Sequence, residues 1–81
     1  MKPTEAILER LCELMVIKKV NKYQLEKRSG LTHSAIRYLF NGTIKDLKFS
    51  TILKFCDALE ITVQEFFNSQ IFDLEKIQYD F

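Results

Sequence analysis

Apolar residues recur at intervals of three and four along most of the chain, which is the spacing of one face of an α-helix. Within residues 3–18 the apolar positions at this spacing are Ile7, Leu8, Leu11, Leu14 and Met15. Pro3 suits the first turn of a helix, where its missing N–H breaks no hydrogen bond, and Lys18 suits the last turn, where a cation meets the negative end of the helix dipole. The pattern therefore predicts a first helix over residues 3–18.

Capping residues divide most of the remaining chain into further helices. Asn21, Thr32 and Thr62 each precede a helical pattern, and the side chains of Asn and Thr accept hydrogen bonds from the free N–H groups of a first turn. Gly30 and Gly42 each follow a helical pattern, at the position that tolerates a left-handed backbone. The predicted helices cover residues 22–29, 33–41, 49–59 and 62–67.

The second half of the chain carries two of these helices and a tail. The apolar positions of the helix over 49–59 are Phe49, Ile52, Leu53, Cys56 and Leu59. Glu65 stands three residues after Thr62, so the short helix over 62–67 begins with a capping box. The remaining stretch, NSQIFDLEKIQYDF, is the only part in which a strand is conceivable. The sequence thus predicts an all-α domain over residues 1–68, with a C-terminal extension over 69–81.

The two glycines isolate the helix over residues 33–41, which a turn of a few residues joins to the preceding helix. Two short helices joined in this way form a helix-turn-helix. Ile36 and Leu39 are expected to face inward, with Phe40 beside them. The polar positions on the opposite, solvent-facing side are His33, Ser34, Arg37 and Tyr38. This side of the helix is the candidate binding surface of the chain.

Charge is segregated along the chain, although the net charge is only +1. Residues 18–54 hold nine basic side chains and two acidic ones, whereas residues 57–81 hold one basic side chain and six acidic ones. The middle of the chain should therefore attract an anion, and its end should not. The helix-turn-helix lies within the basic segment.

Other classes of site find little support in the sequence. Cys12 and Cys56 have neither zinc nor redox spacing, and with one histidine they make no ligand set, so we expect two buried thiols and no metal or other cofactor. No apolar run approaches 18 residues and no signal peptide is present, which favours a soluble cytoplasmic protein away from membranes. No phosphate-binding loop, carboxylate pair or nucleophile–base pair indicates an enzyme or a small-molecule ligand.

Two stretches resemble the phage repressor/Cro family, the XRE-type regulators. NKYQLEKRSGLTHSAIRYLFNG is similar to the family's run from the cap of the second helix to the glycine after the third, and STILKFCDALEITVQEFF to its fourth and fifth helices. The resemblance covers about residues 5–67. The residues at the family's core and turn positions are Leu25, Gly30, Ile36, Gly42, Leu53, Cys56, Leu59 and Phe66. Departures from the pattern occur at Lys22, Phe40, Asn41 and Leu47.

The resemblance implies a compact five-helix, lambda-repressor-like DNA-binding domain whose third helix enters the major groove of double-stranded DNA. The implied base contacts are His33, Ser34, Arg37 and Tyr38. The implied phosphate contacts are Lys22, Thr32, Thr43, Lys45 and Lys48. Each of these residues also has a plainer interpretation, as an exposed or packing side chain with no ligand.

A single module of this kind reads too few base pairs to select one site in a genome, which favours a homodimer on a palindromic operator. The apolar residues at the end of the chain that would form the dimer interface are Phe67, Ile71, Phe72, Leu74 and Ile77, with Tyr79 and Phe81 beyond them. The alternative is a tail that folds back on its own subunit.

The function implied is that of a cytoplasmic, nucleoid-associated transcriptional regulator, of repressor type, as found in bacteria and phages. An alternative from another class is an antitoxin or protein-interaction module built on the same helical bundle. The basic segment favours DNA over a protein partner alone.

Overall fold

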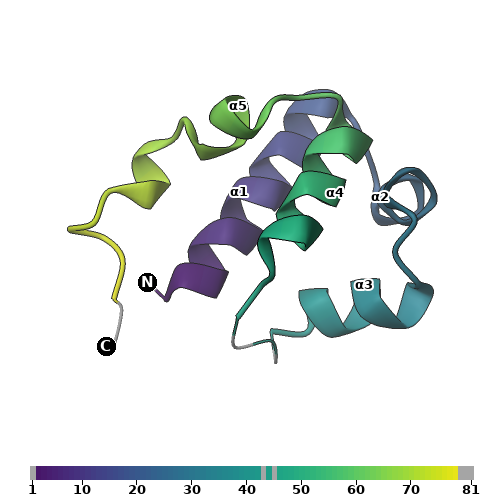
Figure 1. Ribbon diagram of the computed structural model, residues 1–81, viewed down its shortest axis with the longest axis horizontal. Helices are drawn as coiled ribbons and strands as arrows, with labels where there is room; N and C mark the ends of the chain where they lie inside the picture. Colours follow the sequence, from purple (N-terminus) through teal and green to yellow (C-terminus); the bar gives the residue numbers. More distant parts are fainter. Residues whose placement is uncertain (1, 43, 45, 79–81) are drawn as a thin grey trace.

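The computed structural model of the chain describes residues 2–42, 44 and 46–78. Its helices are α1 (Pro3–Lys18), α2 (Lys22–Ser29), α3 (His33–Phe40), α4 (Phe49–Leu59) and α5 (Val63–Phe67), followed by the short 3₁₀-helix η1 (Gln70–Phe72). α1 and α4 lie at the centre, α2 and α3 form one end, and the segment from α5 onward lies at the other (Figure 1). The all-α prediction is confirmed, and in the described residues no strand is present, the tail included.

Side-chain caps begin three of the five helices at the predicted residues. Asn21 Oδ1 accepts from Gln24 N at 2.8 Å while Gln24 Oε1 accepts from Asn21 N at 3.0 Å, and Thr62 and Glu65 form the same reciprocal pair. Thr32 Oγ1 accepts a backbone N–H of the first turn of α3 at 3.1 Å. Such caps satisfy N–H groups that have no partner within the helix. The observed helix ends differ from the predicted ones by one residue at most.

Both glycines adopt the left-handed conformation, with φ of 75° at Gly30 and 80° at Gly42. Their roles nevertheless differ. Gly30 itself closes α2, whereas α3 is closed by Asn41 in a right-handed conformation, and Gly42 follows it. Gly42 therefore redirects the chain after the helix has ended, instead of capping it as predicted.

The buried face of α4 is rotated from the predicted one. Phe55 and Ala58 are buried with Ile52, whereas Phe49 and Leu53, which we expected in the core, are 57% and 42% exposed. Residues two apart lie about 200° apart around a helix. Because Phe55 fills the centre of the core, Leu53 must point outward, and Phe49 one turn earlier lies on the same side. The core residues are Ala6, Leu11, Leu14, Met15, Val20, Leu25, Ile36, Leu39, Ile52, Phe55, Cys56, Ala58, Leu59 and Phe66.

A buried arginine of α1 forms hydrogen bonds with the end of α5, a contact that the sequence did not predict. Arg10 Nε donates to Phe66 O at 2.7 Å, and Nη2 donates to Glu65 O at 2.6 Å and to Asn68 O at 3.3 Å. Nη1 pairs with the carboxylate of Glu13. The last carbonyls of a helix have no partner within it, so the guanidinium supplies the donors that the C-terminus of α5 lacks.

The tail folds back on the same chain at least as far as η1, which packs against α1. The Phe72 ring lies 4.9 Å from that of Phe67 and 6.2 Å from that of Phe66, centroid to centroid. Ile71 and Ile77 are half-buried, and Leu74 is 69% exposed. Part of the apolar surface predicted for a dimer is thus used within the subunit.

The two cysteines differ in environment. Cys56 is buried in the core, and burial raises the pKa of its thiol. Cys12 is exposed, so its predicted burial is wrong, because α1 turns Leu11 rather than its neighbour toward the core. No group of three or more metal-ligating side chains occurs in the described part of the chain. Among the helices described, none is long and apolar enough to cross a membrane.

Candidate nucleic-acid interface

α2 and α3 form the predicted helix-turn-helix, with residues 30–32 as the turn between them. Leu25 of α2 and Ile36 and Leu39 of α3 are buried in the common core. Because these side chains fix the inward faces of both helices, the opposite side of α3 is held at the surface. The four predicted base-contact residues, His33, Ser34, Arg37 and Tyr38, are all exposed.

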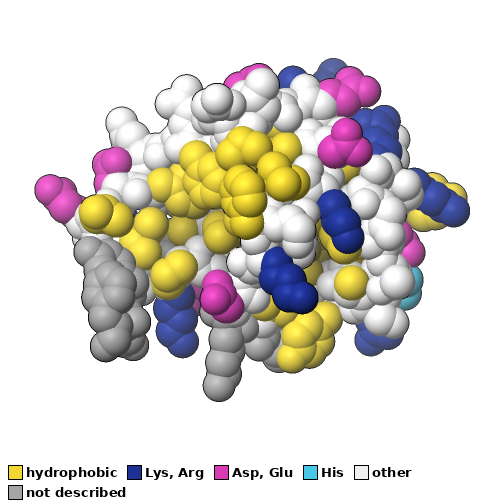
Figure 2. Space-filling view, viewed as in Figure 1, with side chains coloured by type: hydrophobic (Ala, Val, Ile, Leu, Met, Phe, Trp, Pro, Cys, Tyr) yellow, Lys and Arg dark blue, Asp and Glu magenta, His cyan; other side chains and the backbone are white. Residues whose placement is uncertain are grey.

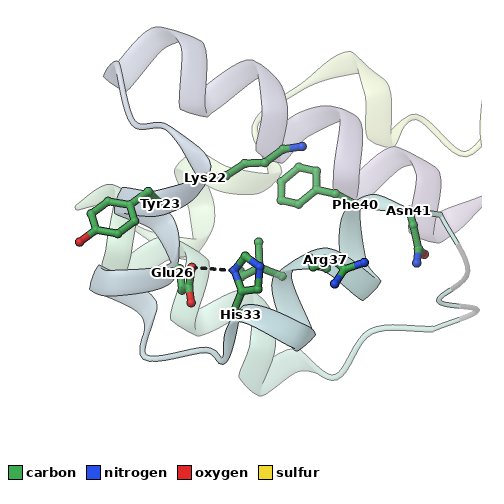
Figure 3. Close-up of a pocket in the computed structure, with 8 residues that line it drawn as sticks. Lys22, Tyr23, Glu26, His33, Arg37, Phe40 and Asn41 are labelled. Carbon is green, nitrogen blue, oxygen red and sulfur yellow. Dashed lines mark hydrogen bonds and ion pairs between the residues drawn. The ribbon is translucent and has the colours of Figure 1, made fainter.

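A groove of about 620 Å³ runs between α2 and α3. His33 and Arg37 line it from α3, and Figure 3 shows them opposite α2. The complete lining is Lys22, Tyr23, Glu26, His33, Ile36, Arg37, Phe40 and Asn41. A second, smaller depression of about 240 Å³ is lined by Ser34, Arg37, Tyr38 and Asn41. Arg37 and Asn41 border both hollows, so Arg37 stands between the two parts of the surface.

His33 contacts an acidic residue of α2. Its Nδ1 lies 3.3 Å from Glu26 Oε2, as the dashed line in Figure 3 marks. The His33 side chain is 71% exposed and that of Glu26 25% exposed. The imidazole is therefore tethered at one nitrogen and open to solvent over most of its surface.

Lys22 is the first residue of α2, where backbone N–H groups and the helix dipole favour an anion. Its Nζ lies 4.6 Å from the centroid of the Phe40 ring, a cation–π contact that holds the ammonium above the α2–α3 groove. Lys22 and Phe40, two of the departures from the family pattern, thus interact with each other. The positive charge stays exposed in this arrangement.

The other predicted phosphate contacts are only partly located. Thr32 is the N-cap residue of α3, and Lys48 is the exposed N-cap residue of α4. Thr43 and Lys45 lie outside the described residues. Thr32 and Lys48 therefore each stand at the start of a helix, and Lys48 adds a positive charge beside α4.

Tyr38 is 55% exposed and points toward the connection between α3 and α4 rather than into the α2–α3 groove. There it lines a further hollow of about 360 Å³ with Leu31, Ala35, Ile44 and Leu47, among others. One side of the ring is thus supported by apolar neighbours while the rest remains open. This position fits a ring that presents both an apolar face and a hydroxyl to a ligand.

Three residues of this surface were missed by the sequence analysis. Tyr23 and Glu26 line the groove from α2, and Asn41 borders both hollows. A signal existed for Glu26, which is one of only two acidic residues among the nine bases of residues 18–54. Tyr23 and Asn41 gave no comparable signal, because both residue types are common on solvated helix surfaces.

In the comparison with protein families, the model of the Cro/C1-type HTH DNA-binding domain matches residues 10–70. Comparisons with curated proteins and with solved structures give no significant match.

Proposed function

The chain belongs to the Cro/C1-type helix-turn-helix DNA-binding family, and from this we propose that it is a sequence-specific transcriptional repressor that binds a palindromic operator as a homodimer. The observation that carries the proposal is the position of Arg37, exposed on α3 between the two hollows. A guanidinium at such a site can bind guanine O6 and N7 with two hydrogen bonds, which is the most common specific contact in the major groove.

The neighbours of Arg37 have complementary chemistry. His33 and Ser34 lie at the N-terminal end of α3, the end that enters the groove first in this class of domain. Tyr38 can place its ring against a thymine methyl group or its hydroxyl on a phosphate. Lys22, Thr32, Lys48, and the undescribed Thr43 and Lys45, would bind phosphates and set the register of α3 without reading sequence.

The proposed dimer would use an exposed apolar face, which we define as Phe49 and Leu53 of α4 and Phe67 of α5. The three side chains are between 36% and 57% exposed. Figure 2 shows hydrophobic side chains gathered over this side of the molecule, from α4 across to the segment after α5. In a dimer with a twofold axis, this face of one subunit packs against the same face of the other. The two α3 helices are then held together and can each bind one half-site. Leu74 and Ile77 of the tail would extend the contact, whereas Phe72 already packs on its own subunit.

The test of the function is selection from a random duplex library at about 150 mM salt, where purely electrostatic binding is weakened. We expect a palindromic consensus with half-sites about one helical turn apart, roughly 34–36 Å. Enrichment of single half-sites would remove the homodimer from the proposal. A pool without any enrichment would instead favour the protein-interaction function, with the exposed apolar face as the surface for a partner.

Replacing Arg37 by alanine is expected to relax selection at one base position in each half-site. Loss of a bidentate arginine–guanine contact costs about 1–3 kcal/mol of discrimination, whereas binding to random DNA should fall only slightly. Fluorescence anisotropy with operator and scrambled duplexes measures both effects. Lys48→Ala is the control, because loss of a phosphate contact should weaken both duplexes alike. Equal losses for Arg37→Ala on the two duplexes would show that Arg37 binds phosphate.

A further inference from the structure

Glu26 is the one negatively charged side chain among the described residues that line the α2–α3 groove. A carboxylate on a surface that binds DNA repels the phosphates and lowers the affinity for every sequence. If Glu26 assists DNA binding, it must do so in some way other than by raising the affinity. The contact between its Oε2 and His33 Nδ1 at 3.3 Å indicates what that contribution is.

The direction of this hydrogen bond follows from the chemistry of the two groups. An ionised carboxylate can only accept, so Nδ1 of His33 must be the donor. In a neutral imidazole one nitrogen carries the proton and the other is an acceptor. A proton on Nδ1 therefore leaves Nε2, the other ring nitrogen, with a lone pair and no hydrogen.

We propose that Glu26 is a positioning residue that sets the base preference of His33, an inference that rests on α3 entering the major groove. With Nε2 as an acceptor, neutral His33 selects a base that offers an amino group, which is N4 of cytosine or N6 of adenine. Without Glu26 the proton can move to Nε2. His33 would then also bind the acceptors of guanine and thymine, and the preference would be lost.

The experiment is library selection with the full chain at pH 8, comparing the wild type, Glu26→Ala, His33→Ala and the double variant. The wild type should enrich adenine or cytosine at one position by about fivefold, as expected for one hydrogen bond. Base ratios within one bound pool are unaffected by the fraction of protein that is active.

Glu26→Ala should lose the preference, because alanine has no side-chain acceptor for the Nδ1–H of His33, yet bind random DNA more tightly because a negative charge is removed. In the His33→Ala background the same substitution should leave all base ratios unchanged, since Glu26 acts through the imidazole. A preference that survives Glu26→Ala overturns the inference. A wild-type pool with no enrichment anywhere would instead overturn the proposed function, on which the inference depends. If Glu26→Ala does not fold, Glu26→Met decides, because methionine keeps the apolar stem and also lacks the carboxylate.

Discussion

Leu53→Lys is expected to convert the dimer into a monomer and to weaken operator binding by about 10²–10⁴-fold, the range lost when two linked binding modules are separated. Leu53 is 42% exposed at the centre of α4, so lysine is tolerated in the folded subunit. In a twofold contact the substitution occurs on both sides, and two ammonium groups are then forced together in an apolar interface. The added positive charge would by itself favour DNA, so a loss of affinity points to the dimer.

Analytical ultracentrifugation measures the oligomeric state, and titration of a full operator against a single half-site measures the coupling. Ile17→Lys is the matched control, because Ile17 is 61% exposed on α1 and lies outside the exposed apolar face. This control should remain dimeric and bind the operator at least as tightly as the wild type. A Leu53→Lys protein that sediments as a dimer would place the interface elsewhere on the molecule.

Arg10→Met is expected to lower the free energy of unfolding by about 2–4 kcal/mol, the cost of leaving buried carbonyl groups without their charged donor. The substitution keeps an apolar stem in the core but removes the donors to Phe66 O and Glu65 O. For a domain of this size the melting temperature should fall by about 10–20 °C. Because α5 carries Phe67, a loosened α5 should also weaken the dimer.

Urea unfolding followed by circular dichroism gives the free energy of the Arg10 variant. Glu13→Gln is the control, since it removes the charge of the ion pair while the bonds from Arg10 to the backbone remain. The Glu13 side chain is 44% exposed, and such pairs contribute only about 0–1 kcal/mol. Equal losses for the two variants would mean that the ion pair, and not the bonds to α5, stabilises the fold.

The sequence by itself determined the helices and their ends. Asn21, Thr32 and Thr62 cap helices through hydrogen bonds to residues three positions away, and Gly30 ends α2 with a backbone conformation of its own. These interactions join residues within one helical turn, so the local sequence is enough to predict them. The periodicity also placed Ile36 and Leu39 inside and the polar side of α3 outside, and it thereby defined the candidate surface.

Only the tertiary structure decided which side of α4 is buried. Helical spacing allowed one face through Phe49 and Leu53 and another through Phe55, since both carry apolar residues at intervals of three and four. Packing of α1 and α2 against α4 selected the face with Phe55. Phe49 and Leu53 were left exposed, and they became the centre of the proposed dimer surface.

The remaining decisions depend on contacts between residues distant in the chain. Arg10 is an ordinary polar position of α1 until α5, 56 residues beyond it, places carbonyl groups within reach of its guanidinium. Glu26 and His33 meet because the turn after α2 sets α3 against it at one particular angle. Helix caps and apolar periodicity depend on residues close together in the sequence, so the sequence predicts them. The partner of a buried donor or of an imidazole nitrogen is fixed only when the helices pack against one another.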